Sequence, residues 1–489
     1  MINEILAAAL EEADRLGVHI IGRYQQVRDI SATVNNGRTE RIVNEETCGF
    51  GVQAFTTEGY SGFAASDSPD VAVARELVAK AAQLAELSKE FNGEKNLSVF
   101  AAPRVVVSIP SPREYAFDKL GVCEIEARVK QVNETLLTAF AGISVQTIFR
   151  QVEDTWSIVR TGGSKADFSM PRAVLVNNIT ARKNGRSVTT RSTLGGVDVG
   201  VLLNHEMLAE GRARGRMMAG LALDLLDAPP VKSGHYKLLI DYALAKGLAH
   251  EAFGHAVETD SVRTSILGRE GKLATGMQVA DPRVSIVDGP IPGDWAYQPV
   301  SANGIIRKTV GIVEKGKLAA GLGDLFSATG AGVEVSGAGR AESFAHLPLP
   351  RMTNIRIEVE NPIPLTKPWH SVTPRELYTL LLDNGLVKPG EEVYYLVGYK
   401  GGQVNTQHGD FVFNCSAVYK LGEIPVLHRP GIFAGKTLSA LKAIRAGIGP
   451  VLTDALGTCG KWGQGVPSSG GSNTFLLLDS SPEITLGGE

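Results

Sequence analysis

The sequence is poor in several features that would place it in a specialised class. Its 489 residues include only four cysteines, too few for a disulfide framework. It has no run of about 18 apolar residues, so no membrane-spanning helix is predicted. The formal net charge is only −3, which argues against a general nucleic-acid-binding protein. The opening MINEILAAALEEADRLG lacks a secretory signal pattern, so we expect a cytoplasmic protein that binds neither membranes nor nucleic acid.

The composition is that of a globular protein with more than one domain. Hydrophobic residues make up 43% of the chain and charged residues 21%. Before residue 228 the apolar periodicity predicts helices over 2–16, 71–87, 125–140 and 204–226, and β-structure over 19–24, 31–34, 49–55, 144–160 and 173–188. Pro229 and Pro230 then end the last of these helices. We therefore predict a mixed α/β amino-terminal domain, 1–228, and a second domain, 229–489.

The second half differs in character. Glycine and proline become frequent, and the alternation of apolar residues from Phe411 to Tyr419 predicts a strand with one buried face. Helices are predicted over 374–382, where Thr373 and Glu376 form a capping-box pattern, and over 434–445. The fold class predicted is α+β, with a β-rich carboxy-terminal half.

One helical stretch, Asp241–Asp260, carries residues suited to metal chemistry. It contains His250-Glu251-x-x-x-His255 in apolar surroundings, with Asp241 as the predicted N-cap. Two imidazoles can ligate a transition metal, and the neighbouring carboxylate can move protons for a metal-bound water. A separation of five residues turns about 140° around a regular helix, so the rings would point apart. A π-type widening, or a break near Gly254, would bring them together; otherwise they are two unrelated core histidines.

A catalytic zinc site needs a third protein ligand. Each of the other histidines is more often an ordinary polar or core residue. Cys459 is the better candidate, because it lies in the glycine-rich segment LGTCGKWGQGVPSSGG, where nearby Lys461 would favour the thiolate. The remaining cysteines are most simply read as small buried hydrophobes: Cys48, Cys123 and Cys415.

Several segments together resemble the TldD/PmbA family of metallopeptidases. They are GFGVQAFTTEGYSGFA (49–64), HEAFGHAVETD (250–260), AGRAESFAHLPLPRMTN (338–354), VGYKGGQVNTQHGDFVF (397–413) and CGKWGQGVP (459–467). The likeness covers nearly the whole chain, and the joint presence of HExxxH and the late CGKxGQ-type segment is its most specific part. Trp462 stands where this family is usually more polar.

The resemblance implies an α+β amino-terminal domain followed by a β-rich, barrel-like carboxy-terminal domain that carries the metal site. It implies Zn²⁺ held by His250, His255 and Cys459, with Glu251 as the catalytic residue. It also implies hydrolysis of short or unstructured peptides in a chamber formed by a homodimer or by a heterodimer with a paralogous subunit.

Other interpretations remain open at the level of sequence. Glu251 could instead orient a histidine, and the chain could be a non-catalytic scaffold or partner subunit of a protease complex. Glu258 and Asp260 could orient a ligand histidine. A last group could either bind a peptide backbone or hold loops together: Gln403, Asn405 and His408.

Overall fold

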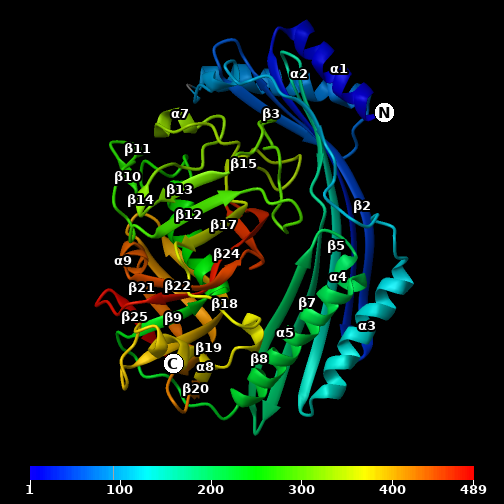
Figure 1. The fold of residues 1–489 in the computed structure, drawn as a ribbon. Coiled ribbons are helices and arrows are strands. Elements are labelled where there is room, and N and C mark those ends of the chain that lie inside the picture. The colour runs from blue at the N-terminus through cyan, green and yellow to red at the C-terminus, as the bar shows by residue number, and fades with distance from the viewer. Residues whose placement is uncertain (92, 489) are drawn as a thin grey trace.

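The computed structural model describes residues 1–91 and 93–488, which form two large β-sheets with helices packed around them. The first sheet, from the amino-terminal half, lies along one side of the molecule. The carboxy-terminal half makes up the other side (Figure 1). None of the described helices has the length and apolar character needed to cross a membrane.

The amino-terminal sheet is built around a long hairpin. Its eight strands within the described residues run in the order β3-β2-β1-β5-β6-β4, with β7 beside β5 and β8 beside β7. Their bounds are β1 His19–Asn35, β2 Arg38–Phe55, β3 Ser61–Ser66, β4 Val106–Ile109, β5 Ile143–Arg160, β6 Ser164–Ser169, β7 Arg172–Lys183 and β8 Arg186–Gly196. Asn36 (φ 48°) and Gly37 (φ 75°) form the turn that connects β1 to β2, since asparagine and glycine tolerate positive φ.

The strands of this hairpin are longer than the short runs predicted for them. Most of the missed residues of β1 are polar, which hides the strand from an apolar pattern. Gln25 donates to Asp154 Oδ1 at 2.8 Å, and Arg150 Nε donates to Asp29 Oδ2 at 2.9 Å. Cross-strand polar partners therefore replace the apolar face that the sequence pattern looks for.

The four predicted amino-terminal helices are confirmed, with ends shifted by a few residues. They are α1 Ile2–Leu16, α2 Val71–Glu90, α3 Val122–Ala139 and α5 His205–Asp224, and a short α4 spans Gly200–Leu203. Helices α1 and α2 share one apolar core with β1 and β2, and α5 packs on β7 and β8. Helix α5 also contributes to a core that includes strands of the second sheet, so the two halves share buried surface.

The second sheet confirms the β-rich carboxy-terminal half. Its described strands run β14-β13-β12-β17-β24-β9-β18-β19-β21-β25, with β20 on β19 and with β22 and β23 on β24. Their bounds are β9 Lys237–Asp241, β12 Val284–Gly289, β13 Val310–Glu314, β14 Lys317–Leu318, β17 Asn354–Val359, β18 Val393–Asn405, β19 Asp410–Lys420, β20 Val426–His428, β21 Ile432–Lys436, β22 Ile444–Leu452, β23 Gly457–Lys461, β24 Gln464–Leu478 and β25 Ile484–Gly487. The end strands β14 and β25 do not pair in the described structure, so this sheet is not a closed barrel.

Small elements complete the carboxy-terminal half. Two two-stranded ribbons pair β10 Gly268–Arg269 with β11 Lys272–Leu273, and β15 Gly339–Arg340 with β16 Leu349–Pro350. The helices are α6 Tyr242–Gly247, α7 Ala328–Ala331, α8 Pro374–Asp383 and α9 Thr437–Lys442. The predicted capping box of α8 is present, with Thr373 and Glu376 bonded reciprocally.

The helix predicted over 434–445 is wrong. Only Thr437–Lys442 is helical, and β21 ends before it while β22 begins after it. Pairing of β21 with both β19 and β25 supplies backbone hydrogen bonds that outweigh the helical preference of Ala434 and Lys436. The domain boundary after Ala228 stays a prediction.

Candidate metal centre

The histidine helix starts from the middle of the second sheet. Strand β9 lies between β18 and β24, and α6 begins directly after it. Asp241 caps this helix as predicted, because its Oδ1 accepts from the Leu244 N–H at 2.9 Å. Its Oδ2 accepts from the Gly398 N–H at 2.5 Å, which ties the helix start to β18.

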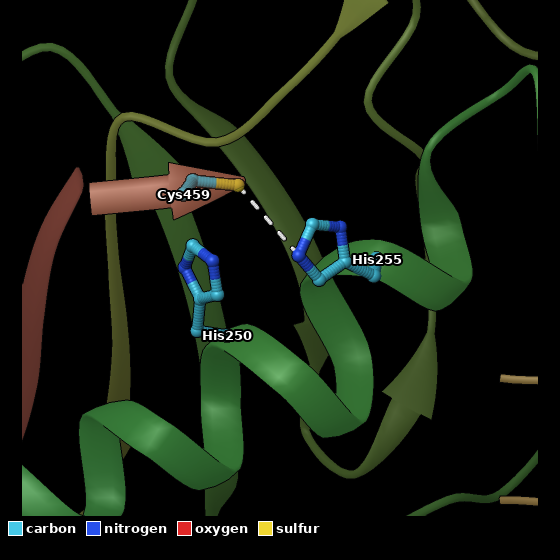
Figure 2. A group of neighbouring side chains, drawn as sticks. All are labelled: His250, His255 and Cys459. Atoms are coloured by element: carbon cyan, nitrogen blue, oxygen red, sulfur yellow. Dashed lines mark hydrogen bonds between the residues drawn. The ribbon is translucent and has the colours of Figure 1, made fainter. Parts of the chain in front are cut away.

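The predicted helical irregularity lies where the histidines need it. Leu248–Gly254 is a π-helix, and a single 3₁₀ turn, His255–Val257, follows it. A π turn joins residues five apart, so His250 and His255 come to the same side of the helix. Their ring centroids are 5.0 Å apart and the planes are nearly perpendicular, at 88° (Figure 2).

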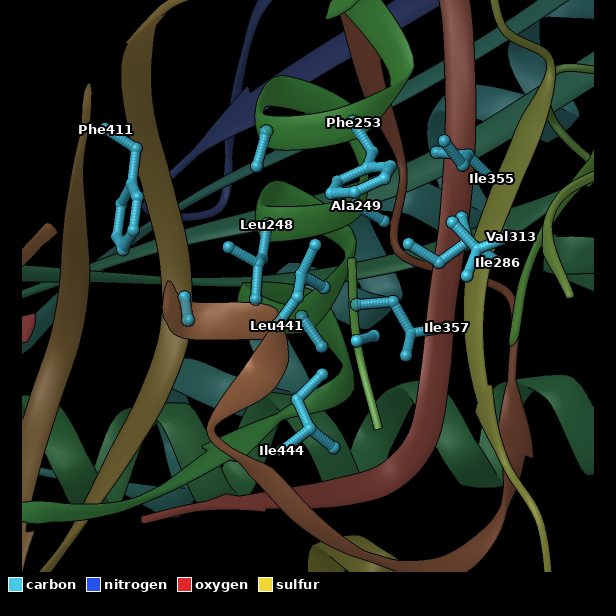
Figure 3. Close-up of a cluster of buried hydrophobic side chains, with 14 of the residues drawn as sticks. Leu248, Ala249, Phe253, Ile286, Val313, Ile355, Ile357, Phe411, Leu441 and Ile444 are labelled. Atoms are coloured by element: carbon cyan, nitrogen blue, oxygen red, sulfur yellow. The ribbon is translucent and has the colours of Figure 1, made fainter. Parts of the chain in front are cut away.

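Packing on the opposite side holds this helix in place. Leu248, Ala249 and Phe253 are buried in the largest apolar cluster of the second half (Figure 3). Gly254 lies so close to Met352 that an added Cβ would be 1.8 Å from the sulfur. The apolar side of the motif therefore anchors the helix, and the histidine side faces the hairpin formed by β23 and β24.

Cys459 comes from that hairpin and completes a group of three ligand residues. One ligand atom from each of His250, His255 and Cys459 lies within 4.8 Å of the others. Cys459 Sγ is 3.6 Å from His255 Nε2 (Figure 2). Bond lengths of about 2.0 Å to nitrogen and 2.3 Å to sulfur place two tetrahedral zinc ligands about 3.5 Å apart, so this spacing fits the ion.

The surroundings of His250 also fit a metal. His250 is 3% exposed, and its Nδ1 is buried without a hydrogen-bond partner among the described residues. Burial, with the nearby cation Lys246, holds the pKa of His250 well below its ordinary value, so the ring is neutral and able to ligate. A polar ring atom buried without a partner is costly unless a bound group satisfies it.

Glu258 orients the second histidine. Its Oε2 accepts from His255 Nδ1 at 3.0 Å and from Lys461 Nζ at 2.8 Å. Burial raises the pKa of Glu258, but His255 and Lys461 outweigh it and hold that pKa below its ordinary value. With Nδ1 committed to this carboxylate, His255 directs Nε2 toward Cys459, which is the arrangement of a carboxylate-oriented metal ligand.

The cation in contact with the thiol is Arg351, not Lys461. Arg351 Nε donates to Cys459 Sγ at 3.3 Å, and its Nη2 donates to the Cys459 carbonyl. Burial opposes ionisation of Cys459, but the His255 hydrogen bond and Arg351 hold its pKa below the ordinary value. Lys461 instead donates to Glu258 and to Asp260 Oδ1. Arg351 was missed because it lies 108 residues from Cys459, although it stands in one of the segments that carried the family resemblance.

Glu251 lies between the two histidines in sequence and is only partly buried. Burial is the main cause that raises the pKa of Glu251; Lys246, and His255 when its ring is protonated, oppose the shift. Glu251 therefore follows a ligand histidine on the same helix, and it is partly open to solvent.

The structure places the other candidates away from this group. Cys415 is buried, as predicted, and its thiol donates to the Gly431 carbonyl, whereas Cys48 is half-buried and Cys123 is exposed. The prediction of burial is thus wrong for Cys123. Asn405 Oδ1 accepts from the N–H groups of Gln407 and His408, so it holds the turn between β18 and β19.

Comparison with known proteins decides the family. One model, described as the PmbA/TldA metallopeptidase C-terminal domain, matches residues 233–458, and another, described as the PmbA/TldA metallopeptidase domain 1, matches residues 23–85. The chain belongs to the PmbA/TldD metallopeptidase family. This confirms the resemblance drawn from the sequence segments.

Relatives match this family member over most of its length. A metalloprotease of Methanocaldococcus jannaschii is 24% identical over 94% of this chain and 96% of its own. A metalloprotease TldD homologue of Haemophilus influenzae is 27% identical over 90% of this chain and 86% of its own. The crystal structure of TldE from Thermococcus kodakarensis has the same fold, with a TM-score of 0.75 at 14% identity over 98% of this chain and 100% of that one.

Trp462 forms the tip of the β23–β24 hairpin. Trp462 (φ 50°) and Gly463 (φ 79°) occupy the two turn positions, and the indole side chain is 84% exposed. The same turn positions between β1 and β2 hold Asn36 and Gly37. Positive φ is unfavourable for a bulky side chain and tolerated by asparagine.

Replacing Trp462 with asparagine is expected to stabilise the protein by roughly 0.5–1 kcal/mol, because asparagine relieves the positive-φ strain. Urea unfolding measures the change. Trp462→Phe keeps the strain and serves as the control. A loss of stability in Trp462→Asn alone would contradict this explanation.

Proposed function

We propose that this chain is a zinc-dependent peptidase that hydrolyses short or unstructured peptides in the cytoplasm, with zinc held by His250, His255 and Cys459. The observation that supports it most is the convergence of these three ligand residues, two of them aligned by the π turn of a helix that also carries the partly exposed Glu251. A site with a purely structural role has no need of that open carboxylate.

The ligand residues and the residues that contact them have different roles. His250, His255 and Cys459 would hold the zinc, which would supply Lewis acidity toward a peptide carbonyl and toward water. Glu251 accepts the proton of the attacking water at its carboxylate and returns it to the leaving amine. Glu258 would orient His255 to ligate through Nε2, and Arg351 favours the thiolate form of Cys459.

The geometry of access favours an extended chain as substrate. A cleft of about 720 Å³ runs between β8, α5 and the segment 454–458, and it reaches Thr458 beside Cys459. A folded protein would have to lose much of its own stability to enter a cleft of this size. We include a second subunit, either another copy or a paralogue, in the proposal; likeness to the fold of TldE supports it, and mass measurement in solution checks it.

The proposal predicts metal-dependent cleavage of unfolded chains. A reduced and alkylated test protein should be degraded, while the same protein in native form should be spared. A zinc chelator should abolish cleavage, and added Zn²⁺ should restore it. Elemental analysis of the purified protein, with gel assays under these conditions, provides the test; cleavage that survives complete metal removal would refute the zinc chemistry.

A further inference from the structure

The cleft beside the metal centre is rich in positive charge. Four basic side chains line it, but only two acidic ones, Asp241 and Asp454. The basic residues are Arg191, Arg214, Lys246 and Lys400. A low-dielectric cleft with this balance attracts anionic groups.

Most of these charges are exposed or already have protein partners. Arg214 contacts Asp454 and Glu210, each at 2.7 Å. Lys400 donates to the Thr189 carbonyl at 3.0 Å, and Arg191 is exposed. The charge of Arg214 is therefore neutralised by its carboxylate partners. Lys400 is held by a backbone carbonyl, and solvent screens the charge of Arg191.

Lys246 differs from them. It lies on α6 four residues before His250, and only 6% of it is exposed. Its Nζ donates to Ser468 Oγ at 3.1 Å. The ammonium also lies against β23, since a Cβ added to Gly457 would be 3.1 Å from Nζ.

This ammonium has donor capacity that the described residues leave unused. A lysine carries three N–H donors, and the hydrogen bond to Ser468 uses one. No carboxylate of the described residues forms an ion pair with it within 4.0 Å. Burial lowers the pKa of Lys246, although the charges of Glu251, Cys459 and Asp294 oppose that shift. Burying an ammonium that has no carboxylate in direct contact is unfavourable. The side chain is thus a buried cation that lines the cleft next to the metal centre.

We propose that Lys246 binds a carboxylate of the peptide substrate, so that the peptidase prefers peptides with a carboxylate near the scissile bond. This inference rests on the proposed peptidase function. The carboxylate is either the free carboxy terminus of the peptide or an Asp or Glu side chain. Lys246 then determines specificity by charge-assisted hydrogen bonds, while the metal ligands and Glu251 carry out the hydrolysis.

Substrate pairs test this without altering the protein. One unstructured peptide, labelled at its amino terminus, is made with a free carboxy terminus and as the carboxamide. A second pair carries Glu or Gln beside the cleaved bond. For the wild-type zinc protein, the KM of one carboxylate-bearing peptide should be about 10- to 100-fold lower than that of its neutral partner. The pair that shows the difference identifies the source of the carboxylate, and equal values in both pairs would overturn the proposal.

Variants then assign the effect to Lys246. Lys246→Met keeps the length of the side chain, and it should reduce the preference for the carboxylate about 10-fold or more. Lys400→Met, from the same cleft, should keep the wild-type preference. An equal loss of preference in both variants would show that the preference comes from the overall positive potential of the cleft and not from an ion pair with Lys246. Melting and zinc content confirm that each variant is folded.

Binding measurements separate this inference from the proposed function. The labelled peptides are titrated against Glu251→Gln protein by fluorescence anisotropy, where hydrolysis is not needed. The inference holds if Glu251→Gln protein has a lower Kd for the carboxylate-bearing peptide than for its neutral partner, and if adding Lys246→Met to that protein removes the difference. It then holds even if the wild-type protein cleaves neither peptide. A wild-type protein that binds the peptides with this preference but cleaves none of them would count against the peptidase function alone. Absence of a carboxylate preference in Kd would refute the role of Lys246.

Discussion

Replacing Cys459 with serine is expected to remove most of the zinc from the protein. A serine hydroxyl remains protonated near neutral pH and is a poor zinc ligand, whereas the Cys459 thiol is held toward the thiolate by His255 and Arg351. Loss of a residue that merely orients a ligand weakens metal affinity about 10–100-fold, so loss of a ligand should exceed that. Elemental analysis after dialysis against a weak chelator measures it, and peptide hydrolysis should fall in parallel.

The chain offers matched controls for this substitution. Cys415 is also buried, but its thiol donates to the Gly431 carbonyl instead of approaching a histidine. Cys415→Ser, Cys48→Ser and Cys123→Ser should therefore keep the zinc content of the wild type. Full zinc occupancy with unchanged affinity in Cys459→Ser would remove Cys459 from the site.

The parts of the site that follow from local chemistry could be predicted from the sequence. Asp241 before an apolar helical run indicates a helix start, and Asn36-Gly37 indicates a tight turn. The five-residue spacing of His250 and His255 indicates an irregular helix if the two rings are to meet, and the π-helix provides it.

Contacts between distant segments could not be predicted in this way. Arg351 reaches Cys459 across 108 residues, and Lys246 reaches Ser468 across 222 residues. Such pairs depend on sheet order, since β23 and β24 bring Cys459 and Ser468 to the helix that follows β9. The helix predicted over 434–445 is wrong for the same reason, because strand pairing overrides a local helical preference.

Glu251→Gln is expected to retain zinc and peptide binding but to lose about 10²–10⁴-fold in kcat. The amide keeps the shape of the carboxylate, and Glu251 is partly exposed, so the fold has little reason to change. What the amide cannot do is accept the proton of the attacking water. Single-turnover assays with saturating peptide isolate this loss from any change in binding.

Glu258→Gln gives the comparison that separates a base from an orienting residue. Glu258 is fully buried and bonded to His255 Nδ1 and Lys461 Nζ, so its loss should act through the histidine. Zinc affinity should fall about 10–100-fold, and saturating zinc should restore much of the hydrolysis. Saturating zinc should not rescue Glu251→Gln, because that variant lacks the proton acceptor and not the metal. Rescue of both variants by zinc, or near-wild-type turnover in Glu251→Gln, would show that Glu251 only orients a ligand.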